Sequence, residues 1–304
     1  MTGQAQPMRA GGAEYQRWLR RPDGACIAYR VCPAAVAADA AGPALALVHG
    51  LASNLTRWSE FVENTSLKDR HDLIRIDLRG HGESPTRRAV GLERWCDDLA
   101  AVLQREGHAK AIVVGHSLGA QVALHFAARH PQRSAGLVLI DPVFRQALHG
   151  RWKLLALAGP LLRAAAATVR ALNAIGLHRR TLPALDLRAL DAMARQALAS
   201  PDAEAAFVRQ YSSMRADLRY VPLAVYLQDL VEMFRPVLAP QSLHAPMLVL
   251  LSSGATFADA GATRALLRRI PRVELQTIDC HHWPLTERPQ EVRRAIERWC
   301  AGLS

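Results

Sequence analysis

One short segment of the chain holds the residue types needed for nucleophilic chemistry. An apolar run over residues 111–114 leads into residues 115–119, GHSLG, and an Ala- and Leu-rich stretch follows and stops before Pro131. The order of strand, sharp turn and helix is the context in which a Gly-x-Ser-x-Gly motif carries a nucleophile. We therefore interpret Ser117 as a nucleophile. The alternative is a buried serine in a glycine-rich turn.

The two glycines of the motif have a steric role. A serine on so tight a turn has a strained backbone, and its neighbours must lack Cβ atoms if the strand and the helix are to pack closely. The turn presents the Ser117 hydroxyl to a base. It also directs the backbone N–H of Leu118, at the positive end of the helix, toward the position of an oxyanion.

The segments around this motif predict an α/β fold. Short apolar strands alternate with helices, which indicates a mostly parallel central sheet covered by helices on both faces. A hairpin with its turn at Asp23-Gly24 is expected first, over residues 15–31. The other expected strands cover residues 44–49, 72–76, 111–114, 136–140, 247–251 and 273–278, and the expected helices cover 58–67, 92–106, 263–269 and 287–301.

The alternation of strands and helices stops at residues 143–245, which contain no convincing strand. Proline residues separate amphipathic helical stretches at 150–175, 186–199, 202–218 and 223–235. Such an insertion after one strand is typical of a lid over the carboxyl edge of the sheet, where open α/β sheets bind ligands. We expect a core of residues 1–142 and 246–304 and a helical cap of residues 143–245.

Composition limits the classes of partner. The net charge is +11, but the basic residues are almost all arginines spread along the chain without interleaved aromatic residues, which argues against a nucleic-acid partner. Attraction to anionic substrates or membrane surfaces stays open. The five scattered cysteines indicate reduced thiols and no structural zinc. No secretory signal is predicted, because the N-terminal residues contain no apolar segment. No transmembrane segment is predicted either, because Arg163 interrupts the most apolar stretch. We therefore expect a cytoplasmic protein. The oligomeric state stays open.

With the motif and the order of strands in hand, the chain resembles the α/β-hydrolase family. The resemblance covers residues 15–142 and 246–301. Further matches are His49-Gly50 at a strand end, the loop of residues 77–84 (DLRGHGES), and residues 280–284 (CHHWP) with Glu287 and Pro289 after them. The resemblance implies that the backbone N–H of Leu51 is a second oxyanion donor beside that of Leu118.

The resemblance also assigns the base and leaves the acid open. His282 falls on the position of the family's catalytic base, with His281 as the alternative. The family usually has an aspartate near position 255, where this chain has alanine. Asp141 occupies an alternative acid position that some members use. Asp259 is the second candidate, although its position before a helix also suits an N-cap. A dyad or another carboxylate stays open.

A serine at the turn separates this chain from the epoxide hydrolases and haloalkane dehalogenases of the same fold, which use aspartate there. The leading hypothesis is a serine hydrolase that acts through an acyl-enzyme on a carboxylic ester of a small to medium, largely apolar substrate. No metal or organic cofactor is expected. Alternatives on the same fold are a C–C bond hydrolase, an acyltransferase, a cofactor-independent oxygenase, or a non-catalytic member that binds a ligand.

Overall fold

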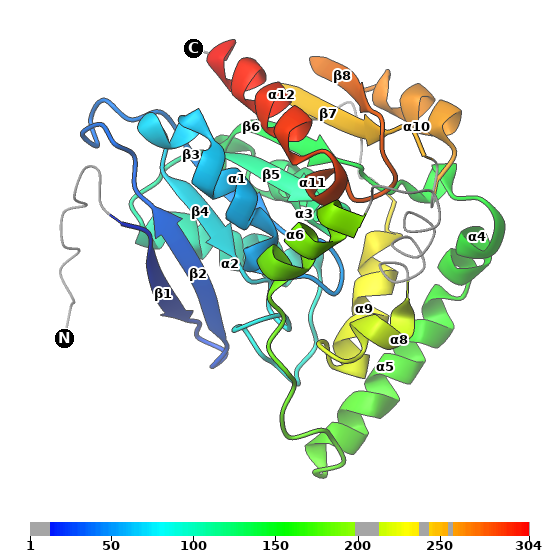
Figure 1. The fold of residues 1–304 in the computed structure, drawn as a ribbon. Coiled ribbons are helices and arrows are strands. Elements are labelled where there is room, and N and C mark those ends of the chain that lie inside the picture. Colours follow the sequence, from blue (N-terminus) through cyan, green and yellow to red (C-terminus); the bar gives the residue numbers. More distant parts are fainter. Residues whose placement is uncertain (1–12, 198–212, 237–242, 255–257, 304) are drawn as a thin grey trace, which may run out of the picture.

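A computed structural model describes residues 13–197, 213–236, 243–254 and 258–303. Its centre is an eight-stranded sheet in the order β1-β2-β4-β3-β5-β6-β7-β8 (Figure 1). Pairing is antiparallel from β1 to β2 and from β2 to β4, and parallel elsewhere, so the predicted mostly parallel sheet is confirmed. The strands are β1 (Tyr15–Arg20), β2 (Cys26–Cys32), β3 (Ala44–Val48), β4 (Leu73–Ile76), β5 (Ala111–His116), β6 (Ser134–Ile140), β7 (Met247–Ser252) and β8 (Val273–Ile278).

Helices cover both faces of the sheet, and this is why the central strands are continuously apolar. In β3, Ala44, Ala46 and Val48 pack with α2 (Leu92–Arg105) and α3 (Leu118–Arg129). Leu45 and Leu47 face the other way, toward α1 (Ser59–Asn64) and α12 (Pro289–Ala301). Side chains alternate between the faces of a strand, so a strand buried on both sides is mostly apolar along its whole length.

One predicted helix of the core is divided in the structure, and another begins two residues later than predicted. The stretch predicted at 58–67 consists of η1 (Leu55–Trp58), α1 and η2 (Ser66–Asp69), because the side chains of Asn54 and Thr65 accept hydrogen bonds from backbone N–H groups and start new turns. The helix predicted at 287–301 is α12, whose first residue is Pro289, and a separate short helix, α11 (Pro284–Glu287), precedes it. The core also contains η3 (Pro131–Arg133) and α10 (Ala260–Leu267).

The described helices between β6 and β7, which we call the cap, are α4 (Gly150–Leu157), α5 (Gly159–Ala174), α6 (Leu187–Ala197), α8 (Met214–Asp217) and α9 (Leu223–Met233). Most of the stretch predicted at 202–218 lies outside the described residues. The stretch predicted at 150–175 is two helices that meet at an angle of 62°. Among the described helices, none is by itself long and apolar enough to cross a membrane, and α4 and α5 reach that length and composition only together.

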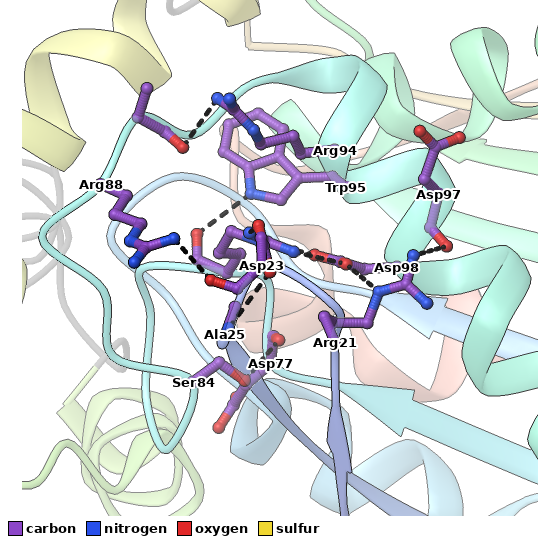
Figure 2. Close-up of polar contacts among 12 residues, drawn as sticks. Arg21, Asp23, Ala25, Asp77, Ser84, Arg88, Arg94, Trp95, Asp97 and Asp98 are labelled. Carbon is purple, nitrogen blue, oxygen red and sulfur yellow. Dashed lines mark hydrogen bonds and ion pairs between the residues drawn. The ribbon is translucent and has the colours of Figure 1, made fainter.

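Buried polar contacts hold the loop between β4 and α2 against the core (Figure 2). Arg79 donates to both carboxylate oxygens of Asp98 on α2, at 2.9 and 2.8 Å, and Arg21 after β1 donates to the same carboxylate at 2.9 Å. The Ser84 hydroxyl donates to the carbonyl oxygen of Asp77 at 2.9 Å and closes the loop. These contacts give this irregular segment a defined shape next to the carboxyl ends of β3 and β4.

Candidate active site

Ser117 lies at the turn between β5 and α3, with φ 53° and ψ −112°. Both flanking glycines are required there. A Cβ atom on Gly115 would lie 2.1 Å from the carbonyl oxygen of Gly119, and one on Gly119 would lie 2.3 Å from that of Val48. The helix therefore approaches the strands closely enough to force the serine into the left-handed region, where a non-glycine residue is strained.

The loop between β8 and α11 brings His282 to this serine. The Nε2 atom of His282 lies 3.0 Å from the Ser117 Oγ, within hydrogen-bond distance. The His282 ring is buried, and its centroid lies 6.0 Å from that of the Trp283 indole. An imidazole in this position can take the proton of the serine hydroxyl.

Asp141, directly after β6, holds the other nitrogen of the ring. Its Oδ2 accepts a hydrogen bond from the His282 Nδ1. The same carboxylate accepts from the backbone N–H of Ser252 at 3.1 Å and from the Ser252 hydroxyl at 2.9 Å. Burial alone would raise the pKa of Asp141, but the His282 ring and these hydrogen bonds hold it below its usual value. Asp141 is therefore the carboxylate that the structure brings to the histidine.

The two alternative residues lie elsewhere. Asp259 accepts a hydrogen bond from the backbone N–H of Ala262 at 2.6 Å and so forms the N-cap of α10. The His281 Nδ1 lies 3.1 Å from the Glu287 Oε2, so its ring is turned toward α11. Position 255, where the family's usual acid was expected, lies outside the described residues.

The two residues predicted to supply oxyanion donors flank Ser117. Leu118 is the first residue of α3, and Leu51 lines the same cavity as Ser117. Gly50 brings the second loop close, since a Cβ atom there would lie 3.4 Å from the Ser117 Cβ. The His49 Nδ1 donates to the carbonyl oxygen of Gly50 at 2.8 Å and its Nε2 accepts from the backbone N–H of Leu78 at 3.0 Å, which ties this loop to the one after β4.

His116 contacts the loop that carries His282. Its Nε2 donates to the carbonyl oxygen of His282 at 3.0 Å. Burial and the nearby His282 ring lower the pKa of His116 to about 3, so it stays neutral. His116 therefore helps to position the loop that carries His282.

A cavity with an empty volume of about 660 Å³, its open mouth included, lies over Ser117. The core and the cap both line it, and the Sδ atom of Met233 on α9 lies 4.0 Å from the Ser117 Oγ. The lining consists of Gly50, Leu51, Ser53, Arg57, His116, Ser117, Trp152, Asp217, Tyr226, Leu230, Met233, His282 and Trp283. The cap therefore provides part of the wall of the site.

Three polar residues of this wall were not identified from the sequence. Arg57 donates to both carboxylate oxygens of Asp191 on α6, each at 2.6 Å. Asp217 is hydrogen-bonded to Tyr226, and burial raises the pKa of Asp217 to about 7. No local motif marks these residues, because each one reaches the cavity only through the packing of the cap on the core. Among the described residues, no group of three or more His, Cys, Asp or Glu side chains is arranged to hold a metal ion.

Comparison with known proteins agrees with this geometry. A family profile described as the alpha/beta hydrolase fold matches residues 43–289. The chain belongs to the α/β-hydrolase fold family. As a member of this family with lipases and esterases among its relatives, the protein is a hydrolase.

Three relatives show how far the similarity extends. Lipase LipV of Mycobacterium tuberculosis is 36% identical over 102 residues, which is 33% of this hydrolase and 38% of LipV. The sn-1-specific diacylglycerol lipase ABHD11 of Mus musculus is 25% identical over 275 residues, or 86% of this hydrolase and 82% of the relative. Among solved structures, a thermophilic esterase from Thermogutta terrifontis superposes with a TM-score of 0.68 at 25% identity, over 95% of this hydrolase and 99% of the esterase.

Proposed function

We propose that this hydrolase cleaves carboxylic esters of small to medium, largely apolar substrates through an acyl-enzyme on Ser117. The observation that carries the proposal is the chain of contacts from the Ser117 Oγ through the ring of His282 to the carboxylate of Asp141. Relatives whose names describe a lipase and an esterase support the ester as the substrate class.

The first half of the reaction follows from this chain of contacts. His282 takes the proton of Ser117 as the Oγ atom bonds to the ester carbonyl carbon. The carbonyl oxygen becomes an oxyanion, which the backbone N–H groups of Leu51 and Leu118 stabilise. His282 then gives its proton to the departing alcohol, and the acyl group stays on Ser117. Asp141 keeps the ring oriented and stabilises its charged form.

The second half repeats these steps with water. His282 takes a proton from a water molecule as the oxygen attacks the acyl carbon, and returns it to the Ser117 Oγ when the carboxylic acid leaves. The apolar side chains of Leu51, Trp152, Leu230, Met233 and Trp283 in the cavity wall suit an apolar acyl or alcohol group.

Covalent labelling with a fluorophosphonate tests the role of Ser117. We expect one label per chain on Ser117, and hydrolysis of p-nitrophenyl butyrate that the label abolishes. Ser117→Ala removes both. Ser134→Ala is the matched control, because Ser134 begins β6 at the end of the strand opposite Asp141. A folded protein that leaves Ser117 unlabelled contradicts the acyl-enzyme.

The same experiment separates the alternatives. Labelling of Ser117 without hydrolysis of any p-nitrophenyl ester, together with turnover of a vinylogous diketone, would favour a C–C bond hydrolase. Turnover of a heteroaromatic substrate with oxygen would favour the oxygenase, and transfer of the acyl group to an added alcohol would favour the acyltransferase. A non-catalytic member would show neither labelling nor turnover. The contact between the Asp141 carboxylate and His282 argues against that alternative.

A further inference from the structure

The outer helices of the cap expose large aliphatic side chains that a globular surface rarely clusters. Six of them lie on α4, on α5 and directly after α5, and their exposed fractions run from 42% to 74%. We call this surface the α4–α5 face: Leu154, Leu157, Leu161, Leu172, Ile175 and Leu177. In Figure 1 these two helices form the outer border of the cap, with α9 on the inner side of α5.

The spacing along α5 shows that one side of the helix is covered and the rest is exposed. Leu162, Ala166, Val169 and Asn173 are the buried or half-buried positions of one helical stripe, and α5 packs against α9. A second stripe, Leu161, Ala165, Thr168, Leu172 and Ile175, is exposed at every position. A helix with an apolar stripe turned to solvent is typical of a surface that binds something apolar.

The charge of the same segment indicates what this surface binds. Residues 142–185 contain no aspartate or glutamate, and they contain seven arginine and lysine residues. Arg151 and Lys153 are exposed on α4 beside Leu154 and Leu157, and Arg180 is exposed after α5. Basic side chains next to exposed aliphatic ones match the headgroup layer of an anionic bilayer, where the aliphatic groups enter the lipid and the cations meet phosphate.

We propose that the α4–α5 face docks the protein on an anionic phospholipid surface. A second copy of this chain is the less favourable partner, because a two-fold contact through this face would bring the two acid-free basic segments together. Docking here also places the site close to the lipid: Trp152 on α4 and Leu230 on α9 line the cavity above Ser117. Binding itself does not depend on the proposed reaction.

Sedimentation with lipid vesicles tests the proposal with the full-length Ser117→Ala protein, which cannot consume the lipid. We expect it to partition onto vesicles of phosphatidylcholine mixed with phosphatidylglycerol at least tenfold more strongly than onto phosphatidylcholine alone. Raising the salt concentration should weaken this binding, because salt screens the interaction of exposed charges with the surface. Absence of binding to the mixed vesicles overturns the proposal.

Variants locate the surface. Combining Leu154→Ser, Leu161→Ser and Ile175→Ser replaces the three most exposed side chains of the face, and should lower partitioning at least tenfold. The apolar control combines Trp18→Ser and Leu275→Ser, since Trp18 on β1 is 55% exposed and Leu275 on β8 is 40% exposed, and both strands are sheet edges. The control should bind like the parent. Equal losses in both proteins overturn the assignment to the α4–α5 face.

Charge is tested in the same way. Lys153→Gln with Arg180→Gln should lower partitioning about tenfold or more, since one basic residue near an anionic surface contributes roughly fivefold. Arg268→Gln with Arg269→Gln removes the same charge from exposed positions after α10 and should have little effect.

In an otherwise wild-type chain, the serine variants should hydrolyse p-nitrophenyl butyrate normally, which separates docking from catalysis. A dimer that the serine variants dissociate would make the second copy the partner and overturn the proposal.

Discussion

The Nε2 atom of His81 and the Oδ2 atom of Asp229 lie 3.0 Å apart, and both side chains are fully buried. His81 belongs to the loop between β4 and α2, and Asp229 belongs to α9, so this pair joins the core to the cap. Burial raises the pKa of Asp229. Burial would lower the pKa of His81, but the neighbouring Asp229 carboxyl outweighs this effect and raises it.

Removal of one partner of this pair should loosen the cap. Asp229→Ala leaves His81 buried without its carboxylate, and we expect a loss of about 3 kcal/mol in the free energy of unfolding, measured with urea. The matched control is Asp97→Ala, which removes a surface ion pair with Arg129 at 2.7 Å and should cost less than about 1 kcal/mol. Equal losses would show that the buried pair has no special role in holding the cap.

The choice of acid can be tested by a pair of substitutions. Asp141→Asn keeps the size of the side chain and tolerates the left-handed backbone at φ 47°, but it cannot orient His282 as a carboxylate does. We expect kcat for an ester to fall by about 10⁴. Asp259→Ala should keep kcat and lose about 1 kcal/mol of stability, because it removes an N-cap. The reverse pattern in steady-state kinetics would assign the acid to Asp259.

The close approach of α3 to β3 predicts which glycine tolerates a methyl group. Gly119→Ala should lose about 2–3 kcal/mol of stability, because its Cβ atom would meet the backbone of Val48, which cannot move aside without shifting the strand. Gly159→Ala is the control, since no atom lies within 4 Å of a Cβ atom built there. Thermal unfolding measures both. If the two variants unfold at the same temperature, α3 does not pack against β3 closely enough to exclude a methyl group at position 119.

The carboxyl of Asp217 should make stability depend on pH. Burial raises its pKa to about 7, so the folded protein keeps this proton while the unfolded chain releases it from about pH 4 upward. The stability of the wild type relative to an Asp217→Asn variant should therefore fall as the pH rises from about 4 to 7, by roughly 3 kcal/mol. Asp217→Asn carries no charge and can still bond Tyr226, so it should lack this decline. Parallel stability profiles of the two proteins between pH 4 and 8 would contradict the assignment.

Local patterns in the sequence predicted most of the sheet. The central strands are short and mostly apolar, and the turn at Asp23-Gly24 joins β1 and β2 as expected. One of the inaccurate helix boundaries has a single side chain as its cause. Thr65 caps η2 by accepting from the backbone N–H of Leu67, and it divides a stretch whose periodicity alone predicts one helix. Periodicity reports which face of a segment is apolar, and it does not report a hydrogen bond that ends a turn.

The sequence by itself determined the nucleophile candidate, the base candidate and the order of the core elements, because each depends on neighbours a few positions away. At Gly115 the steric demand is local, because a Cβ atom there would meet the carbonyl oxygen of Gly119 in the same turn, whereas at Gly119 it would meet the carbonyl oxygen of Val48 on β3. The tertiary structure alone decided which aspartate reaches His282, since the two residues are 141 positions apart and an aspartate before a helix serves equally well as a cap. The polar wall of the cavity and the buried His81–Asp229 pair likewise depended on how the cap packs on the core, because a contact between distant segments has no periodic signature in either one.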